Sequence, residues 1–326
     1  MSDTIRWGIL GTGSIAHQFA GDLRYADGAE LAAVGSRTQE AADAFGDEFG
    51  IPRCHGTYEA LADDPGVDVI YVATPHSCHK DNTILCLECG KAVLCEKPFA
   101  INRNEAETMA AKAREQGLFL MEAMWSRFFP LMRRVRQLAA DGAIGEVRMV
   151  TADFGFRAEY EAESRLFDPA FGGGSLLDVG VYAVSFASML LGEPHRVEAM
   201  AELGKTGVDE QCAIIFGYEG GQLAALQSGI RTTTPHEATV IGAEGYIRLF
   251  PKFWNPTRIM LARDGKESFE EDLVEGRGFH FEVSEVMRCL DAGETESPIM
   301  PLDESIAIMD TMDRVRAKWG LKYPME

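Results

Sequence analysis

Basic residues are in short supply in this chain. It has 31 lysines and arginines against 51 aspartates and glutamates, which gives a formal net charge of −20. Nucleic acids and anionic membrane surfaces bind proteins through clustered positive charge. The charge balance therefore argues against both as partners. A dinucleotide is also anionic, so a site for one would need local positive charge on this acidic background.

Long apolar runs and signs of secretion are missing as well. We find no stretch of membrane-spanning length, and Met1, Ser2 and Asp3 do not begin a signal-peptide pattern. The composition, with 46% hydrophobic and 25% charged residues, is typical of a soluble globular protein. We expect a cytoplasmic protein with no membrane partner.

A disulfide framework is also absent from the sequence. The seven cysteines are an odd number and gather mainly in the first hundred residues, unlike those of a secreted disulfide-linked protein. Cys86 and Cys89 have the spacing of a redox or metal pair, but there is no second pair and no histidine directly after Cys89. His76 and His79 are also spaced for a metal, without an evident third ligand nearby. We predict reduced, buried helix cysteines and no metal site.

What the chain does have is enough length for two domains and a regular alternation of elements. Its 326 residues exceed the usual size of one domain, and no internal repeat or long linker interrupts them. The predicted strands of the first part are residues 5–10, 29–35, 69–74, 92–95 and 118–122, and the predicted helices are residues 14–23, 39–49, 80–89 and 105–116. Alternating strands and helices build a parallel sheet, and near-continuous apolar strands fit burial on both of its faces. We predict a doubly wound α/β domain over residues 1–122.

A glycine turn follows the first predicted strand and opens the first predicted helix. The segment reads Gly11-Thr12-Gly13-Ser14-Ile15-Ala16. A phosphate-binding turn must reverse sharply, let the backbone approach a pyrophosphate, and pack the helix closely on the strand. Gly11, Gly13 and Ala16 meet these three needs in that order, and the helix N-terminus offers free N–H groups to the anion. The turn predicts a dinucleotide-binding Rossmann domain.

The end of the second predicted strand indicates which dinucleotide is bound. The sequence there is Val34-Gly35-Ser36-Arg37-Thr38, without the carboxylate that usually bonds the adenosine ribose hydroxyls. Ser36 and Arg37 suit a 2′-phosphate instead, which favours NADP over NAD. The alternative is that Arg37 is a solvated residue at the start of a helix, with Thr38 as the N-cap.

The pattern changes beyond residue 125. The predicted strands there are residues 147–156, 196–203, 212–218, 222–230, 238–242, 246–250 and 259–262, and the predicted helices are residues 131–140, 175–191, 279–290 and 303–318. Alternating strands joined by glycine turns are typical of an antiparallel sheet. We predict an α+β domain over residues 123–326 with an open, mostly antiparallel sheet. The alternative for its terminal helix is packing back on the first domain.

Four features of the chain resemble one family. They are the glycine turn, Thr74-Pro75 after a strand, Glu96-Lys97-Pro98 after the next strand, and Asp178 on a later helix. Together they resemble the Gfo/Idh/MocA family, named for glucose-fructose oxidoreductase and inositol dehydrogenase. The segments 121–130 and 172–182 look most like the branch that contains dimeric dihydrodiol dehydrogenase and NADP-dependent D-xylose dehydrogenase. The resemblance extends over essentially the whole chain.

The resemblance implies a set of cofactor-binding residues. They are Gly11, Thr12, Gly13, Ser14, Ile15, Ser36, Arg37, Thr74, Pro75, His76, His79, Glu96, Lys97 and Arg127. The sequence departs from the family pattern at two positions: His76 stands where asparagine is usual, and Tyr182 stands where many members have histidine.

Lys97, Asp178 and Tyr182 are the predicted catalytic residues. Oxidation of an alcohol needs a general base at the hydroxyl while hydride leaves the carbon. Asp178 and Tyr182 are four positions apart, so they share one face of a helix. A cation such as Lys97 would lower the tyrosine pKa from its usual value of about 10, and Asp178 would orient the lysine or a substrate hydroxyl. The alternatives are a core tyrosine and an aspartate that stabilises the first helical turns.

The function that these residues predict is NADP-dependent dehydrogenation of a sugar, cyclic polyol or vicinal diol, or the reverse reduction. Trp125, Phe154 and Phe156 are candidates for an aromatic wall beside a ring-shaped substrate, although aromatic runs are more often core. The rival prediction is a sensor or regulator that binds NADP without turnover. The resemblance also implies a homodimer or larger homo-oligomer formed through the open second-domain sheet.

Overall fold

The computed structural model describes residues 4–326, so the signal-peptide prediction for residues 1–3 lies outside the described part. The chain forms two compact units. The first unit consists of Met1–Ala100, Asn104–Phe128 and Val274–Ile306, and the second of Ile101–Arg103, Phe129–Leu273 and Ala307–Glu326. The chain therefore leaves the first unit near residue 128 and returns to it with residues 274–306.

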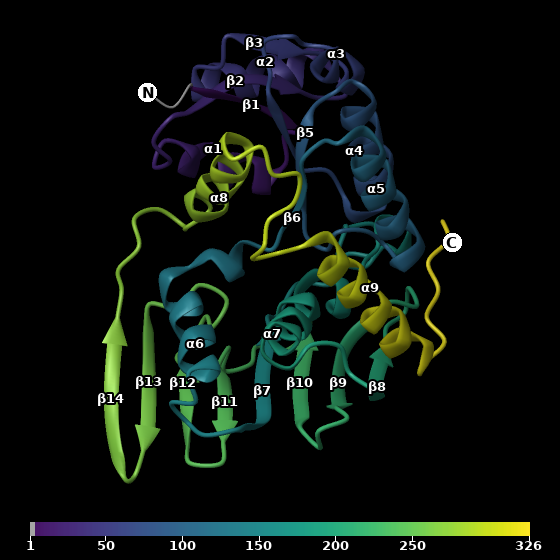
Figure 1. Cartoon of the computed structure of the whole chain (residues 1–326). Coiled ribbons are helices and arrows are strands. Elements are labelled where there is room, and N and C mark those ends of the chain that lie inside the picture. The colour runs from purple at the N-terminus through teal and green to yellow at the C-terminus, as the bar shows by residue number, and fades with distance from the viewer. Residues whose placement is uncertain (1–3) are drawn as a thin grey trace. The chain divides into compact units, whose positions relative to one another are not determined.

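The first unit contains a six-stranded parallel sheet in the order β3-β2-β1-β4-β5-β6 (Figure 1). Its strands are β1 (Ile5–Leu10), β2 (Ala29–Gly35), β3 (Arg53–His55), β4 (Val69–Val72), β5 (Ala92–Glu96) and β6 (Leu120–Ala123). Its helices are α1 (Ser14–Leu23), α2 (Gln39–Phe49), α3 (Tyr58–Ala62), α4 (His79–Glu88), α5 (Arg103–Gln116) and α8 (His280–Asp291). The order confirms the predicted doubly wound sheet.

Burial on both sheet faces explains the apolar strands of this unit. Every residue of β4 and β5 is buried. On one side Phe19 of α1 stacks on Tyr71 of β4, with ring centroids 3.7 Å apart, and the Trp7 ring lies 5.6 Å from Phe19. These large rings fix α1, and with it the glycine turn, against the centre of the sheet.

Helix α8 belongs to the first unit although the sequence analysis assigned residues 279–290 to the second domain. The carboxylate of Asp22 on α1 accepts hydrogen bonds from the backbone N–H groups of Arg277, Gly278 and Phe279, at 2.8, 2.8 and 3.1 Å. A buried carboxylate with three N–H donors is a strong helix cap. This contact joins residues more than 250 positions apart, which helical periodicity cannot indicate.

The second unit is built on an eight-stranded sheet in the order β14-β13-β12-β11-β7-β10-β9-β8. Its strands are β7 (Val147–Gly155), β8 (Arg196–Leu203), β9 (Asp209–Gly217), β10 (Leu223–Gly229), β11 (Ala238–Gly242), β12 (Gly245–Leu249), β13 (Arg258–Arg263) and β14 (Lys266–Glu271). Only the β7–β10 pair is parallel, which confirms the predicted mostly antiparallel sheet.

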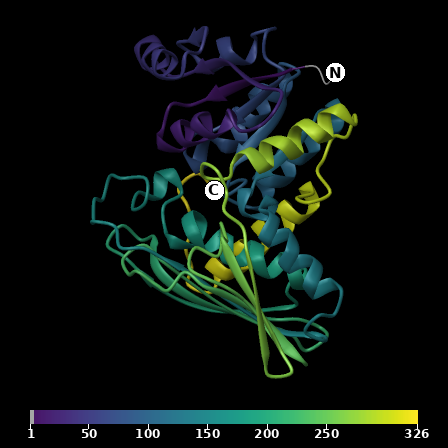
Figure 2. The same ribbon diagram turned by 90° about the vertical axis from the view of Figure 1, so that its left-hand side faces the viewer.

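Helices cover one face of this sheet and leave the other open (Figure 2). They are α6 (Pro130–Ala140), α7 (Val181–Leu191) and the part of α9 (Leu302–Ala317) that begins at Ala307. Along β9, Ile214 and Phe216 are buried on the helix side, whereas Ala213 and Ile215 are exposed on the open side. The alternation is the expected pattern for a sheet that is covered on one face.

One prediction about apolar length needs correction. The helical segment Pro169–Leu191 is long and apolar enough to cross a membrane by length and composition, and 78% of its most apolar window is buried inside the protein. The segment packs on β7 and β10 of the second unit. Burial on all sides explains its composition, as in other core helices.

Candidate functional site

The glycine turn adopts the geometry that a phosphate-binding turn needs. Gly11 has φ +106°, and a Cβ there would lie 2.9 Å from the carbonyl oxygen of Ala73. A side chain is excluded at this position by both backbone conformation and space. Gly13 precedes α1, is exposed, and would meet nothing within 4 Å if it carried a Cβ. The N-terminus of α1 is therefore open to a ligand, and Ala16 is fully buried behind it.

Ser36 lies beside the glycine turn. It is buried at the end of β2, and its Oγ is 3.1 Å from Oγ1 of Thr12. Arg37 is exposed, and the Thr38 side chain accepts a hydrogen bond from the N–H of Ala41, so Thr38 is the N-cap of α2. The structure places a hydroxyl pair and an arginine at the carboxyl ends of β1 and β2. A Thr38 N-cap is compatible with either role of Arg37, binding of a 2′-phosphate or exposure to solvent.

His79 links two predicted parts of the site. It is fully buried at the start of α4, and its two ring nitrogens lie 2.8 Å from the Pro98 carbonyl oxygen and 2.9 Å from that of Thr74. Burial lowers the pKa of His79. Asn82, one helical turn later, donates to Oγ1 of Thr74 at 3.0 Å. His79 and Asn82 therefore hold the Thr74-Pro75 segment, with buried His76 next to it, against the segment that follows β5.

Glu96 is the last residue of β5 and points into the core of the first unit. Its carboxylate accepts hydrogen bonds from the Tyr71 hydroxyl and, at 3.0 Å, from the backbone N–H of Lys97. Lys97 is half-buried, and its peptide bond to Pro98 is cis. The Glu96 side chain therefore holds the backbone of Lys97 in place.

Arg127 and Trp125 lie on the short 3₁₀ turn Trp125–Phe128 after β6. Arg127 is buried and donates through Nη2 to Glu304 at 2.7 Å. The nearby Glu122 is fully buried and accepts from the N–H of Phe99 at 3.1 Å, and burial raises its pKa to about 7. Trp125 stacks on Phe279 with centroids 4.7 Å apart. These contacts give both residues neighbours within their own unit.

Asp178 lies on a π-helical turn in the second unit. The sequence predicted one α-helix over residues 175–191, but Leu176–Gly180 is π-helical and α7 follows at Val181. Asp178 is buried, and its carboxylate accepts a hydrogen bond from Nη1 of Arg165 at 2.8 Å. Single π-helical turns occur often at functional sites. Arg165 is a partner that the sequence analysis missed.

Tyr182 belongs to an aromatic cluster in the second unit. Phe154 of β7 stacks on Trp254 with centroids 3.5 Å apart and planes 1° from parallel. The buried Tyr182 ring lies 5.5 Å from Phe154 and 6.3 Å from Trp254, and the His236 ring lies 5.3 Å from Phe154. Trp254 and His236 come from loops and carry no periodic signal. The sequence signal for the loop of Trp254 is the turn-forming pair Asn255-Pro256 that follows it.

Phe156 is held at the end of the sheet by a backbone hydrogen bond. It follows β7, is half-buried, and its N–H donates to the carbonyl of Gly229 at 3.0 Å. The structure therefore brings Phe154 and Tyr182 together and places Phe156 at the adjoining strand ends.

The cysteines form no disulfide within residues 4–326. All seven cysteines are free thiols, Cys86 is buried, and Cys89 lies 3.3 Å from Oδ1 of Asp63. Within residues 4–326 no group of three or more histidine, cysteine, aspartate or glutamate side chains is placed to hold a metal ion.

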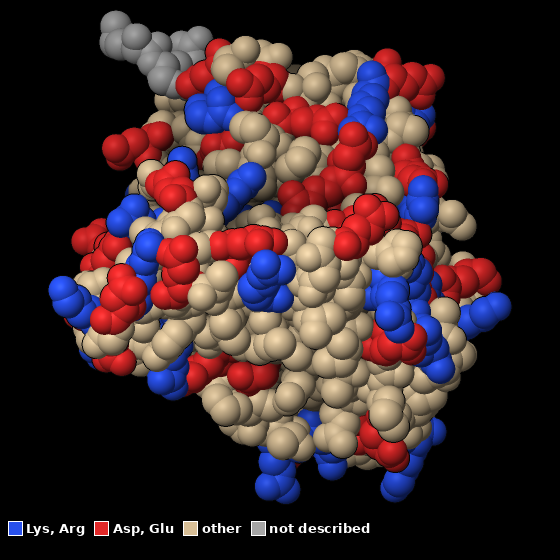
Figure 3. Space-filling view, turned by 60° about the horizontal axis from the view of Figure 1, so that its bottom comes forward, with Lys and Arg blue, Asp and Glu red and all other residues tan. Residues whose placement is uncertain are grey.

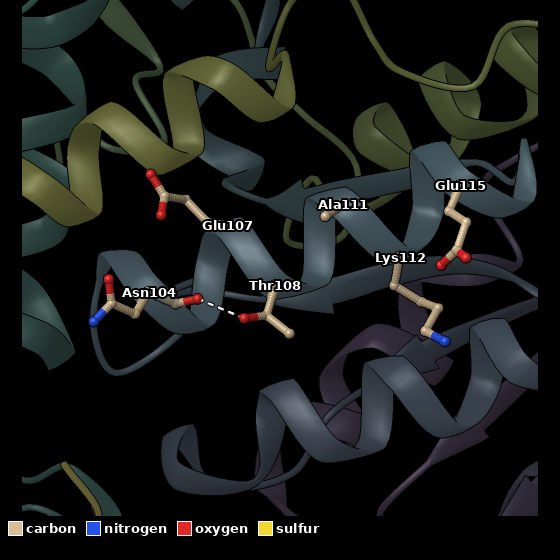
Figure 4. Close-up of a pocket in the computed structure, with 6 residues that line it drawn as sticks. All are labelled: Asn104, Glu107, Thr108, Ala111, Lys112 and Glu115. Atoms are coloured by element: carbon tan, nitrogen blue, oxygen red, sulfur yellow. Dashed lines mark hydrogen bonds between the residues drawn. The ribbon is translucent and has the colours of Figure 1, made fainter.

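A shallow hollow on the outer face of α5 contains none of the predicted site residues (Figure 4). It is lined by Asn104, Glu107, Thr108, Ala111, Lys112 and Glu115. Lys112 pairs with Glu88 at 3.0 Å, as expected for a solvated helix face. On the face that Figure 3 presents, lysine and arginine side chains are interspersed with aspartate and glutamate.

Comparisons with known proteins agree with these arrangements. Residues 5–124 match the profile "Oxidoreductase family, NAD-binding Rossmann fold", and residues 132–248 match the "GFO/IDH/MocA C-terminal domain". Trans-1,2-dihydrobenzene-1,2-diol dehydrogenase is 38% identical in Mus musculus and 36% in Homo sapiens, and each alignment covers 99% of both chains.

Solved structures that are similar over 97% of this chain include an aldose-aldose oxidoreductase and a 3-ketoreductase. Aldose-aldose oxidoreductase from Caulobacter crescentus, complexed with glycerol, has a TM-score of 0.88 at 26% identity and is covered over 97% of its length. A 3-ketoreductase from Actinomadura kijaniata, in complex with TDP-benzene and NADP, has a TM-score of 0.84 at 27% identity and is covered over 98%.

Proposed function

The chain belongs to the Gfo/Idh/MocA family of oxidoreductases, and we propose that it is an NADP-dependent dehydrogenase of a vicinal diol, cyclic polyol or sugar. The observation that carries the proposal is the aromatic cluster of the second unit. The buried ring of Tyr182 lies beside the stacked rings of Phe154 and Trp254, and Tyr182 follows the buried, arginine-paired Asp178 by four residues. Aromatic faces bind the apolar face of a ring, and the polar groups bind its hydroxyls.

NADP is the proposed cofactor, with NAD as the weaker ligand. Gly11, Gly13 and the N-terminus of α1 suit the pyrophosphate, and Ser36 with Arg37 suits a 2′-phosphate. The similar 3-ketoreductase from Actinomadura kijaniata is described in complex with NADP, which supports the choice. When bound, the oxidised cofactor supplies the acceptor for hydride from the carbinol carbon.

Tyr182 is the proposed general base. It takes the proton of the substrate hydroxyl as the carbonyl forms, and it returns a proton in the reverse reaction. The ammonium of Lys97 stabilises the negative charge that develops on oxygen. Asp178, held by Arg165, accepts a hydrogen bond from a substrate hydroxyl and so orients the ring. The proton thus moves from substrate oxygen to Tyr182, and the electron pair leaves with the hydride.

A homodimer is the proposed assembly, formed through the open face of the eight-stranded sheet. That face carries large exposed apolar side chains: Met200, Ile215, Leu223, Tyr246 and Phe269. Monomers rarely expose so many on one sheet face. Sedimentation equilibrium of the wild type and of a Met200→Lys, Ile215→Lys double variant tests this. We expect a dimer for the wild type and a weakened dimer for the variant; a monomeric wild type would remove the assembly from the account.

A substrate panel tests the proposed function. Trans-dihydrodiols, cyclitols and aldoses are incubated with NADP and with NAD, and reduced nicotinamide is followed by its absorbance. We expect turnover of at least one vicinal diol or ring-form sugar, faster with NADP. NADP binding without turnover on any of them would favour a sensor or regulator over an enzyme.

A further inference from the structure

A buried polar cluster lies beneath the helical segment that carries Asp178 and Tyr182. Its centre is Asp209, the first residue of β9, which is fully buried. One carboxylate oxygen of Asp209, Oδ2, accepts hydrogen bonds from the Ser175 hydroxyl and from the backbone N–H of Leu176, both at 2.7 Å. Ser175 and Leu176 stand three and two positions before Asp178 in the chain.

The cluster continues to the other end of the π-helical turn. The Ser175 hydroxyl lies 2.9 Å from the Ser228 hydroxyl on β10, and Ser228 lies 3.1 Å from Sγ of Cys212 on β9. A Cβ on Gly180, the last residue of the turn, would come within 3.0 Å of the Ser228 hydroxyl. Asp209 and Ser228 therefore contact the beginning and the end of Leu176–Gly180.

The C-terminal tail holds the glycines that precede the turn. The hydroxyl of Tyr323, which is buried, donates to the carbonyl oxygen of Gly173 at 2.8 Å. The backbone N–H of Tyr323 donates to the carboxylate of Glu326 at 2.8 Å, and Glu326 pairs with Arg316. Gly174 has φ +114°, and a Cβ there would overlap Oδ1 of Asp209. Gly174 is thus the residue that lets the carboxylate reach the backbone of the turn.

Stability alone does not explain an acidic residue at this position. Burial raises the pKa of Asp209 to about 6, because desolvation disfavours the carboxylate. Its second oxygen, Oδ1, is buried and has no hydrogen-bond partner within residues 4–326. A buried carboxylate with an unsatisfied oxygen lowers stability. The carboxylate does provide one oxygen that accepts two hydrogen bonds, from the Ser175 hydroxyl and from the Leu176 N–H. It thereby holds these two neighbouring residues in place.

We propose that Asp209 is a positioning residue for the dehydrogenase reaction, acting through Ser175 and Leu176 on the turn that presents Asp178, and that Tyr323 assists it through Gly173. The inference rests on the proposed function. Misplacement of a catalytic group by about 1 Å can lower the rate about a hundredfold, so a small shift of this turn is enough.

The first test compares Asp209→Asn with the wild type. The substitution keeps the shape and removes the charge that accepts both donors. We expect kcat to fall about ten- to a hundredfold while KM changes less than about threefold, and while NADP affinity and melting temperature stay at or above wild type. A merely structural residue would lower the melting temperature and leave kcat unchanged, and that result would overturn the proposal.

Tyrosine variants supply a matched pair. Tyr323→Phe removes a hydroxyl that donates to Gly173, and Tyr218→Phe removes a buried hydroxyl that has no hydrogen-bond partner in the described part of the same unit. We expect a fall in kcat for Tyr323→Phe and wild-type kcat for Tyr218→Phe. Equal effects of the two substitutions would contradict the role of Tyr323.

Amide hydrogen exchange tests the same inference without any turnover. If the wild type transfers no hydride, the proposed function fails, and the exchange result still decides the role of Asp209. We expect the amides of residues 176–182 to exchange faster in Asp209→Asn and Tyr323→Phe than in the wild type and Tyr218→Phe. Unchanged exchange in Asp209→Asn would show that the carboxylate does not hold the turn.

Discussion

Arg165 donates to the carboxylate of Asp178 at 2.8 Å, from a side chain that is 56% exposed to one that is 7% exposed. The hydrogen bond joins the loop that carries Arg165 to the π-helical turn. It fixes the orientation of the buried Asp178 carboxylate. Arg165 lies largely at the surface, so its substitution removes the partner of Asp178 without leaving a cavity in the core.

Substitution of Arg165 should therefore affect catalysis through Asp178. We expect Arg165→Gln to lower kcat/KM about tenfold, since a charge-assisted hydrogen bond contributes about 1.5 to 3 kcal/mol and this one is partly exposed. Arg165→Lys should recover part of the loss because it restores the charge without the planar fork. Wild-type kcat/KM in the glutamine variant would show that the pair is not needed.

Tyr182→Phe removes the proposed general base and leaves the aromatic ring in place. General acid–base groups contribute about 10² to 10⁴ in rate, so kcat should fall by that order while NADP affinity stays the same. The pH profile of kcat/KM should also lose the limb at low pH that belongs to the base. A variant that keeps both its turnover and that limb would move the proton transfer to another group, with Lys97 the first to examine.

Lys97→Ala should lose turnover much more than cofactor binding. A cation that faces developing alkoxide charge acts mainly in the transition state, and loss of one such group costs about a hundredfold or more in kcat. Lys112→Ala is the control, because Lys112 is a lysine on the outer face of α5 that pairs with Glu88. Near wild-type kcat in a folded Lys97→Ala protein would show that Lys97 is not needed for turnover.

Arg37→Ala should weaken NADP binding at least about tenfold and leave NAD binding unchanged, since a charge-assisted contact to phosphate contributes about 1.5 to 3 kcal/mol. Dissociation constants for both cofactors, measured by fluorescence titration, check this. Equal affinities of the wild type for NADP and NAD would contradict the cofactor assignment.

Glu282 offers a stability prediction with a defined pH dependence. This α8 residue is fully buried, neither carboxylate oxygen has a hydrogen-bond partner within residues 4–326, and burial together with the charge of Glu96 raises its pKa well above the usual value. The folded state therefore holds the proton more tightly than the unfolded state. The stability that this proton provides is present below the unfolded pKa and is lost as pH rises toward the folded pKa.

Glu282→Gln should thus raise the melting temperature at pH 8 and change it little at pH 4.5. Calorimetry at both values gives the comparison. A glutamine variant that is less stable than wild type at pH 8 would show that the carboxylate has a favourable role that burial alone does not reveal.

Local sequence patterns predicted most elements because those elements are periodic and long. The bounds of β1, β2, α1 and α2 agree with the predicted ranges. β3 and α3 were missed because three and five residues are too few for a period to appear. β14 was missed because its residues, Lys266–Glu271, are mostly polar and exposed.

Non-local contacts account for what the sequence could not show. Asp22 accepts hydrogen bonds from the residues before α8 and so binds this helix to the first unit. Arg165 pairs with Asp178, and Trp254 stacks on Phe154. In each contact one partner lies in a loop without a periodic signal. The π-helical turn also depends on a residue outside its own segment, because Asp209 on β9 accepts its first backbone N–H. Motif spacing identified candidate residues; their partners come from the tertiary structure.

In the proposed reaction, hydride passes directly between a substrate carbinol carbon and the nicotinamide. The most direct measurement uses a vicinal diol or aldose deuterated at the reacting carbon, incubated with this protein and oxidised NADP, with the reduced cofactor analysed by mass spectrometry. We expect one deuterium in each reduced nicotinamide, a slower rate than with unlabelled substrate, and loss of the labelled product in Lys97→Ala and Tyr182→Phe. Reduced cofactor without deuterium, or no reduction with any substrate class of the panel, would contradict it.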